Sequence, residues 1–213
     1  AKSYTQGWYS FFIYMELPTK LKNKYFIIRH GESKANMSEI ILSHTKHGTQ
    51  EDFTLTETGE EQVKSSVKKV KEESLLNSEP IIYSSSFSRC KRTAEIAKEV
   101  LGVKDEIHFD DRLRERWFGD FEKTHNSNYQ KVWDEDIKDA THKNFNAESP
   151  QEVQNRTISL INYLENKYKG KSILLVSHGD ALQILQTAFL SKSAKEHRRL
   201  PHLHIAEIKE LNF

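Results

Sequence analysis

The fold of this chain is decided by the stretch Tyr25-Phe-Ile-Ile-Arg-His-Gly-Glu-Ser-Lys-Ala-Asn36. Its first four residues favour β-structure and show no polar alternation, which is typical of a strand buried on both faces of an α/β sheet. The apolar run stops at Arg29-His30-Gly31, and such sheets bind ligands at the carboxyl ends of their strands. The stretch therefore predicts a buried strand with a functional site at its end.

The residues at the end of this predicted strand suit phosphate chemistry. His30 is a candidate nucleophile, Arg29 is a fixed cation, and we expect Gly31 to let the backbone turn tightly. Ser33 and Asn36 follow at helical spacing, so their side chains and the first free N–H groups of a helix can face the same anion. The alternative is a solvated Arg-His pair, and the tripeptide alone favours it.

Size and charge limit the classes of function. The 213 residues suffice for one hydrophobic core, and we expect an N-terminal extension, residues 1–24, before one domain, residues 25–213, with an insertion at about 120–147. With 32 Lys and Arg against 31 Asp and Glu, the formal net charge is +1. This balance does not indicate a partner that is a nucleic acid or an acidic membrane. Any strong positive field must be local.

Cys90 is the only cysteine, which excludes an intrachain disulfide and fits a cytoplasmic location. No apolar stretch approaches the length that spans a bilayer, and the longest candidate, Trp8 to Leu17, is interrupted by Ser10 and Glu16. We expect the aromatic residues of the extension to pack on the domain or on a second subunit rather than on a membrane. A homo-oligomer stays open.

Strands and helices alternate along the rest of the chain. After the first strand, further strands are predicted at 79–84, 107–110, 171–177 and 202–211, and helices at 88–101, 152–168 and 181–190. An earlier helix begins near Thr56 or Thr58, where Thr58 and Glu61 have the spacing of a capping box. Polar residues with spaced aromatics predict a mostly helical insertion that covers the site. This order favours an α/β fold whose mostly parallel central sheet is flanked by helices on both faces.

Further candidate site residues lie near the ends of the later strands. Arg89 is in the first turn of a predicted helix and is a second cation for the same pocket. Glu115 lies between Arg114 and Arg116, either as an acid beside a cationic site or as a solvated charge. His178-Gly179 follows the clearest strand and repeats the pattern of the first one. Each of these residues alone is compatible with an ordinary surface position.

Other histidines do not indicate a metal site. His44 and His47 have the spacing of a metal-binding pair, but no third ligand follows at a suitable distance, so we interpret them as part of a solvated loop. His202 and His204 alternate with Leu203 on one predicted strand face, and we expect them to be structural or solvated. No metal and no cofactor are predicted.

Taken together, the motifs resemble the histidine phosphatase superfamily, also called the phosphoglycerate mutase-like fold, from Tyr25 to about Leu211. The matching motifs are Arg29-His-Gly-Glu-Ser33 with Asn36, Leu55-Thr-Glu-Thr-Gly59, Ser85-Ser-Phe-Ser-Arg89 with Thr93-Ala94, Leu113-Arg-Glu-Arg-Trp-Phe-Gly119, Glu148-Ser149 and Ser177-His-Gly179. Each motif is a weak match alone, whereas all of them in the family's order are specific.

The resemblance implies a metal-independent reaction that passes through a phosphohistidine. His30 would attack phosphorus while Arg29, Arg89 and His178 hold the phosphoryl oxygens. Glu115 would protonate the leaving group and later take a proton from water. Nearby arginines lower the pKa of Glu115 and burial raises it, and the sequence does not decide which effect is larger. The expected phosphate-binding set is completed by Ser33, Asn36 and Gly179.

We expect a phosphomonoester hydrolase that acts on a small phosphorylated metabolite, with a phosphoglycerate mutase as the alternative. Glu115 and His178 lie 178 − 115 = 63 positions apart, which is compact for mutases of the family, and little sequence follows the last predicted strand. Asp180 stands where these mutases typically have asparagine, and its charge would repel a phosphoglycerate carboxylate. A catalytically weak phosphate-binding module is the second alternative, although binding alone does not need the acid Glu115.

Overall fold

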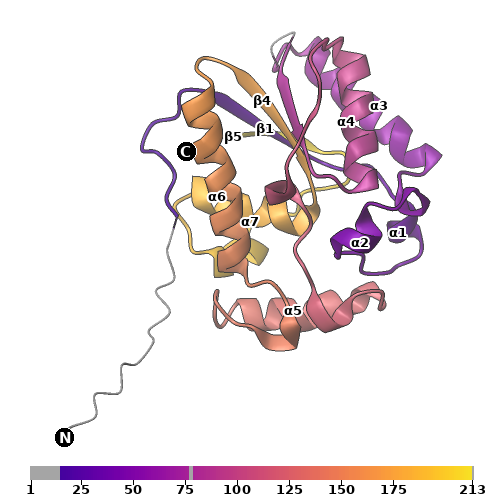
Figure 1. Cartoon of the computed structure of the whole chain (residues 1–213), viewed down its shortest axis with the longest axis vertical. Helices are drawn as coiled ribbons and strands as arrows, with labels where there is room; N and C mark the ends of the chain where they lie inside the picture. The colour runs from indigo at the N-terminus through magenta and orange to yellow at the C-terminus, as the bar shows by residue number, and fades with distance from the viewer. Residues whose placement is uncertain (1–14, 77–78, 213) are drawn as a thin grey trace, which may run out of the picture.

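A five-stranded sheet is the centre of the computed structural model, which describes residues 15–76 and 79–212 (Figure 1). Its strands lie in the order β3-β2-β4-β1-β5. They are β1 (Lys24–Arg29), β2 (Ile81–Ser84), β3 (His108–Phe109), β4 (Ser172–Ser177) and β5 (Ile208–Leu211). The first four strands of this order pair in parallel, and β5 pairs antiparallel with β1. The prediction of a mostly parallel sheet is confirmed.

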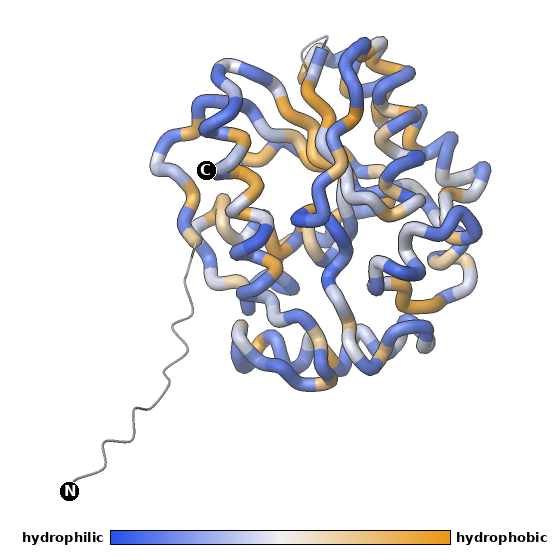
Figure 2. Tube along the Cα trace, viewed as in Figure 1, coloured by the Kyte–Doolittle hydropathy of each residue, from blue (hydrophilic) through white to orange (hydrophobic). Residues whose placement is uncertain are grey.

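Helices cover both faces of the sheet. α3 (Glu57–Glu72) and α4 (Ser88–Leu101) lie on one face, and α6 (Pro150–Lys167) and α7 (Gly179–Phe189) lie on the other (Figure 1). Phe26 and Ile28 of β1 pack with α3 and α4, whereas Tyr25 and Ile27 pack with α6 and α7. Both faces of β1 are therefore buried, which explains its continuous apolar sequence. Figure 2 shows the hydrophobic colour along the central strands.

The remaining helices are short. They are α1 (Lys34–Met37), α2 (Thr45–Gly48) and α5 (Tyr129–Asp136), with 3-10 turns η1 (Glu51–Phe53), η2 (Asp111–Leu113), η3 (Gly119–Phe121), η4 (Asn126–Asn128), η5 (Asn144–Asn146) and η6 (Ala194–Arg199). We call residues 120–147 the cover. The cover contains α5 and lies beyond one end of the sheet, at the bottom of Figure 1.

Two local predictions were wrong. The last strand begins at Ile208 rather than at residue 202, because Ala206 turns the chain with φ 57 and ends any extended run before it. The capping box of Thr58 and Glu61 does not form. Thr56, the other predicted candidate for the N-cap, does cap α3, and its hydroxyl accepts the N–H of Gly59.

The described part of the expected N-terminal extension packs against α6. Leu17 and Leu21 join the core beneath this helix, and the backbone N–H of Lys22 donates to the carboxylate of Glu165 over 2.6 Å. The aromatic residues before Met15, and our expectation for them, lie outside the described residues.

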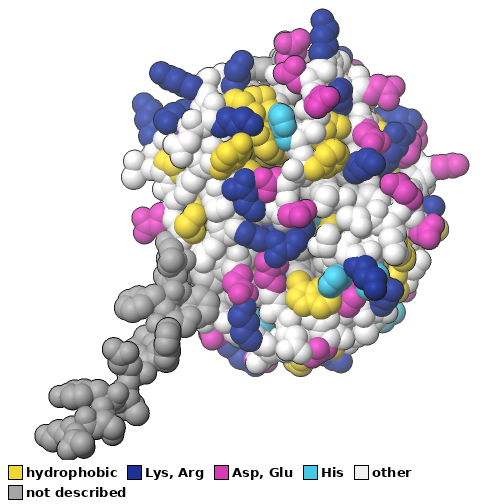
Figure 3. Space-filling model, viewed as in Figure 1, with side chains coloured by type: hydrophobic (Ala, Val, Ile, Leu, Met, Phe, Trp, Pro, Cys, Tyr) yellow, Lys and Arg dark blue, Asp and Glu magenta, His cyan; other side chains and the backbone are white. Residues whose placement is uncertain are grey.

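The distribution of surface charge and the composition of the helices relate to the expected absence of nucleic-acid and membrane partners. On the face shown in Figure 3, basic and acidic side chains are interspersed, in keeping with the formal net charge of +1. Within residues 15–76 and 79–212, no helix has both the length and the apolar composition needed to cross a membrane.

Candidate active site

A cavity of about 210 Å³ lies at the carboxyl ends of β1 and β4. Seven of the eight residues that we predicted for the site line it, and they come from the β1 loop, α4, the loop before the cover and the start of α7. They are Arg29, His30, Ser33, Asn36, Arg89, Glu115 and Gly179. Parallel strands β1 and β4 end side by side at Arg29 and Ser177, so the fold brings the two histidine-glycine motifs together.

Close packing, not a tight turn, explains the glycine after His30. A Cβ atom on Gly31 would clash with the backbone of Gly59 at the start of α3, and a Cβ atom on Gly59 would clash with the carbonyl of Glu32. Gly31 does not have the positive φ of a left-handed turn. The expectation that it lets the chain turn tightly is therefore wrong, and the two glycines instead let the loop that carries His30 lie against α3.

His30 has the protonation state that a nucleophile needs. Its Nδ1 lies 2.7 Å from the carbonyl oxygen of Gly31, which only accepts hydrogen bonds, so Nδ1 carries the proton. Nε2 accepts a hydrogen bond from Nε of Arg89 over 3.1 Å. Burial, assisted by Arg89 and Arg29, holds the pKa of His30 well below its ordinary value. The imidazole is therefore neutral, and the electron pair of Nε2 carries no proton.

Arg29 and Arg89 are only partly satisfied by the protein. Arg29 Nη1 donates to the carbonyl of Leu203 and lies 2.9 Å from Nε2 of His202, and Arg89 Nη2 donates to the carbonyl of Leu42 over 3.0 Å. Arg29 Nε and Arg89 Nη1 are buried and have no hydrogen-bond partner among the described residues. Unsatisfied buried donors are rare, and two of them on one cavity suit the oxygens of a phosphate group.

Ser33 and Asn36 form the capping box of α1. The Ser33 hydroxyl donates to Asn36 Oδ1 over 2.9 Å, and the backbone N–H of Ser33 donates to the same oxygen over 3.0 Å. The predicted pair is thus in the cavity wall, but its oxygens first serve to hold this turn.

Burial decides the charge of Glu115. Its side chain lies inside the protein, and desolvation raises the pKa of Glu115 to about 7, although the guanidinium of Arg89 acts in the opposite direction. The adjacent arginines do not reverse this effect, because the guanidinium of Arg114 binds Glu148 and that of Arg116 binds Asp136. Among the described residues, the backbone N–H of Arg116 donates to Glu115, over 2.9 Å. This pKa suits an acid that must also act as a base near neutral pH.

His178 lies behind the cavity wall rather than in it. Its side chain is fully buried, and its ring centroid is 5.3 Å from that of His30. Its Nδ1 is 3.8 Å from a Glu115 oxygen, and its Nε2 is 3.0 Å from the Ser85 hydroxyl. Burial, with Arg89 nearby, holds the pKa of His178 well below its ordinary value, so this imidazole is neutral as well.

Arg116 connects the loop that carries Glu115 to the cover. Its guanidinium makes two parallel hydrogen bonds to Asp136 of α5, over 2.6 and 2.7 Å, and a third to Asp180 of α7 over 3.1 Å. The guanidinium of Arg116 points to these two carboxylates and not to Glu115, so its charge does not lower the pKa of Glu115 in the way that the sequence neighbourhood led us to expect.

The negative charge of Asp180 is compensated by neighbouring side chains inside the protein. Its oxygens accept hydrogen bonds from Arg116 and from the indole N–H of Trp133, the latter over 3.1 Å. Burial acts to raise the pKa of Asp180, but the neighbouring His197 and Arg116 outweigh it and hold the pKa below its ordinary value. Asp180 lines the cavity, but these neighbours compensate its charge, so it weighs less against a phosphoglycerate than an unpaired carboxylate would.

Several cavity residues were not found from the sequence. Tyr129 and Trp133 of α5 stack at 5.3 Å, and the guanidinium of Arg198 lies 3.8 Å from the Trp133 ring centroid. Their four-residue spacing on a helix signals a shared face, but only the fold shows that this face closes the cavity. His202 also lines the cavity, where its Nε2 lies 2.9 Å from Arg29 Nη1, and it lies in a loop rather than in the predicted strand.

His44 and His47 also take part in packing rather than in a solvated loop alone. Nδ1 of His47 lies 2.9 Å from the Glu122 carboxylate, which links this loop to the cover. In the described part of the chain, no group of three or more His, Cys, Asp or Glu side chains is placed to hold a metal ion.

Comparisons with known proteins agree on one family. A family model of the histidine phosphatase superfamily (branch 1) matches residues 25–213. The probable phosphoglycerate mutase GpmB of Photorhabdus laumondii is 34% identical over 180 residues, which cover 82% of this chain and 78% of that protein. Among solved structures, Bacillus stearothermophilus YhfR has a TM-score of 0.72 and 26% identity, covering 88% of this chain and 90% of that one.

A mycobacterial structure shows the same fold at lower identity. The mycobacterial glucosyl-3-phosphoglycerate phosphatase Rv2419c, in complex with VO3, has a TM-score of 0.71 and 23% identity, covering 88% of this chain and 90% of that one. With the family match over residues 25–213 and the relative at 34% identity, these similarities establish that the chain belongs to the histidine phosphatase superfamily.

Proposed function

We propose that this protein is a metal-independent phosphomonoester hydrolase that acts on a small phosphorylated metabolite through a phosphohistidine at His30. One observation carries the proposal. The buried donors Arg29 Nε and Arg89 Nη1, which have no partner among the described residues, belong to the same cavity as a neutral imidazole. Two fixed cations and an uncharged nucleophile are what transfer of an anionic phosphoryl group needs.

In the first step, His30 Nε2 bonds to phosphorus as the bond from phosphorus to the leaving oxygen breaks. Arg89, in the first turn of α4, turns its donors from Nε2 to the phosphoryl oxygens. Arg29, at the end of β1, binds the same oxygens. His178 lies behind the cavity wall against His30 and would turn its ring toward the cavity to reach the same oxygens. The bond from Nδ1–H to the Gly31 carbonyl stabilises the positive charge that the imidazole ring gains. Ser33, Asn36 and Gly179 shape the wall around the phosphate.

Glu115 serves both halves of the reaction. In its protonated form it gives a proton to the leaving alkoxide, and the resulting carboxylate then takes a proton from the water that attacks phosphorus. The bond between phosphorus and Nε2 breaks, inorganic phosphate leaves and His30 is neutral again. A pKa of about 7 keeps both forms of Glu115 accessible near neutral pH.

The size of the cavity favours a small substrate. A volume of about 210 Å³ holds a phosphate group with a short organic part, and Tyr129 and Trp133 of the cover close it. A cytoplasmic location is part of this proposal, supported by a single, buried cysteine with its free thiol.

A phosphoglycerate mutase is the second candidate. The curated relative at 34% identity is named a probable phosphoglycerate mutase, and the balanced charge of Asp180 permits a substrate carboxylate. In a mutase, a second hydroxyl of the substrate receives the phosphoryl group from His30 in place of water.

A phosphate-release screen tests the proposal. The chelator-treated protein is assayed on phosphoglycerates, sugar phosphates, phosphoserine and small vitamin phosphates, and in parallel for interconversion of 2- and 3-phosphoglycerate primed with a bisphosphate. We expect phosphate release to exceed interconversion and to survive chelation. Faster interconversion would establish the mutase, and activity that returns only with added metal would contradict the metal-independent mechanism.

A further inference from the structure

A buried cluster of charged side chains joins the cover to the Glu115 loop, to α7 and to η6. It consists of Arg116 from the Glu115 loop, Asp136 from α5, Asp180 from α7 and His197 from η6. The side chains of Arg116, Asp136 and His197 are fully buried, and that of Asp180 is 5% exposed. Charges in such a place must balance, because an unpaired buried charge is costly.

Arg116 cannot balance the cluster alone. It donates to two carboxylates, Asp136 over 2.6 and 2.7 Å and Asp180 over 3.1 Å. Arg198 lies 4.0 Å from Asp180, but its Nη1 donates to Gln183 over 2.6 Å and its side chain is 24% exposed, so its charge is shared with solvent. Two buried carboxylates thus face one buried guanidinium.

His197 has the geometry of the missing cation. Its Nδ1 lies 3.0 Å from the carbonyl oxygen of Ala194, which requires a proton on Nδ1. Its Nε2 lies 3.5 Å from an oxygen of Asp136 and 3.5 Å from an oxygen of Asp180, and no donor among the described residues reaches it. A bare Nε2 would direct its electron pair at two carboxylates, whereas a protonated Nε2 attracts both.

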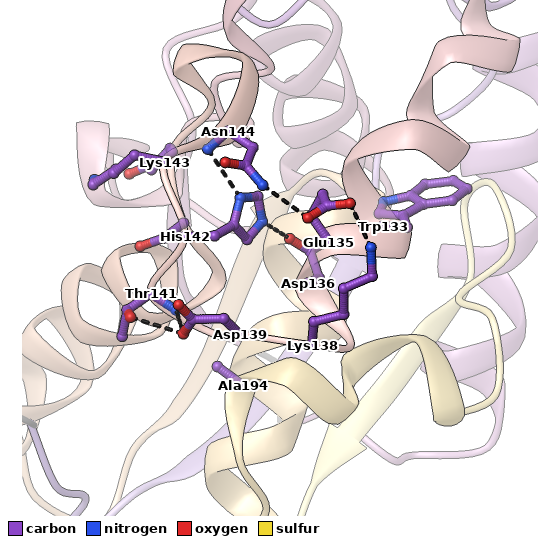
Figure 4. Close-up of polar contacts among 12 residues, drawn as sticks. Trp133, Glu135, Asp136, Lys138, Asp139, Thr141, His142, Lys143, Asn144 and Ala194 are labelled. Carbon is purple, nitrogen blue, oxygen red and sulfur yellow. Dashed lines mark hydrogen bonds and ion pairs between the residues drawn. The ribbon is translucent and has the colours of Figure 1, made fainter.

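His142 also contacts Asp136, but its two ring nitrogens have different partners from those of His197. Figure 4 shows its ring between Asp136 and Asn144. Nε2 lies 2.6 Å from Asp136 Oδ1, and Nδ1 accepts the backbone N–H of Asn144 over 3.2 Å. One nitrogen donates and the other accepts, so the neutral ring satisfies both contacts. His142 therefore adds no charge to the cluster.

We infer that His197 is an imidazolium that holds the cover on the core through Asp136 and Asp180, and that it is a positioning residue for the cavity wall. The indole N–H of Trp133 donates to Asp180, and Arg198, the neighbour of His197, covers the Trp133 ring. Without the positive charge of His197, the cluster is net negative. The attraction between cover and core then weakens, and the wall formed by Trp133 loosens.

Hydrogen exchange of the cover tests this inference. Amide protection of residues 120–147, relative to an unfolded reference, is measured from about pH 6 to about pH 9, the range in which histidines lose their protons. All of these exchange measurements use the Glu115→Gln background. Glu115 has a pKa of about 7 and accepts a hydrogen bond from the Arg116 backbone, so its own titration would otherwise add to the signal. We expect cover protection to fall by about tenfold as pH rises, while β4 and α6 keep theirs.

Two substitutions separate charge from packing. In His197→Gln the cover should be weakly protected at every pH, because the charge is gone. In the matched control His142→Gln, protection should drop overall but keep its pH dependence. An unchanged pH dependence in His197→Gln would overturn the inference.

A measurement on the unmodified protein tests the same inference without relying on the variants to fold. Nitrogen-15 spectra of His197, assigned through its bonds, should show both ring nitrogens protonated at neutral pH. A single protonated nitrogen would overturn the inference. Neither measurement needs turnover, so both stand even if the protein is not a phosphatase.

Discussion

Arg89 Nε donates a hydrogen bond to His30 Nε2 over 3.1 Å, and both side chains are buried. The contact gives the direction of the electron pair with which His30 would attack phosphorus. Burial, followed by the charge of Arg89, lowers the pKa of His30 and so keeps that pair free of a proton. We therefore assign Arg89 two tasks, which are to keep the nucleophile neutral and to bind the phosphoryl oxygens.

Replacement of Arg89 by lysine should reduce kcat/KM by about 10²–10³, because lysine cannot donate from two fixed positions. The matched control is Arg92→Lys on the same helix, since Arg92 pairs with Glu60 and Glu95 instead of lining the cavity. Steady-state kinetics on p-nitrophenyl phosphate and inhibition by inorganic phosphate measure both effects. Equal losses in the two variants would contradict a phosphate-binding task for Arg89.

Replacement of Glu115 by glutamine should slow alkyl phosphates far more than p-nitrophenyl phosphate in the first step, because nitrophenolate leaves without a proton. General acid catalysis of this kind is worth about 10²–10⁴ in rate. Single-turnover kinetics on the two substrates give the comparison. A loss that is independent of the leaving group would show that Glu115 is not the acid.

The raised pKa of Glu115 also predicts how stability depends on pH. Its pKa is about 7 in the folded protein against an ordinary value of 4.5, so the folded state holds the proton more tightly. The associated stability is fully present below the unfolded pKa and is lost as pH rises through about 7, amounting to about 3 kcal/mol.

Glu115→Gln removes this dependence. Urea unfolding at about pH 5 should give similar stabilities for the variant and the parent, whereas at about pH 8 the variant should be the more stable by about 2–3 kcal/mol. A difference that stays constant with pH would mean that burial does not raise the pKa of Glu115.

Gly59→Ala should destabilise the protein by about 2 kcal/mol or more and lower activity, because the new methyl group meets the Glu32 carbonyl on the loop that carries His30. Gly102→Ala is the control. Its Cβ meets nothing within 4 Å, so only the strain of φ +77 acts, at about 1 kcal/mol. Thermal unfolding of both variants provides the test, and equal shifts would argue against close packing at Gly59.

The sequence predicted the sheet, and it predicted most of the residues that line one cavity, because both depend on local patterns. The unbroken apolar run of β1 and the polar residues at strand ends are visible without any tertiary information. The order of the motifs along the chain then brought His30, Arg89 and Glu115 into one site.

The remaining features depend on contacts between distant segments. The guanidinium of Arg116 is held by Asp136, 20 positions away, so the place of Arg116 next to Glu115 in the sequence does not tell where its charge lies. The charge balance of Asp180 and the place of Arg198 in the cavity wall likewise arise only when α7, η6 and the cover meet. For Glu115, burial raises the pKa and nearby arginines lower it. Which effect is larger depends on how deeply the side chain is buried, and the spacing of residues in the sequence does not reveal this.

The most direct test of the central claim is to trap the phosphoenzyme. Glu115→Gln is mixed with p-nitrophenyl phosphate, quenched in alkali and digested, and the peptide His30-Gly-Glu-Ser-Lys34 is sequenced by mass spectrometry. We predict one phosphate on the His30 ring that survives alkali and is lost in acid, and its absence in the double variant with His30→Ala. A phosphate on Ser33 or elsewhere, or turnover that persists in His30→Ala, would contradict the account.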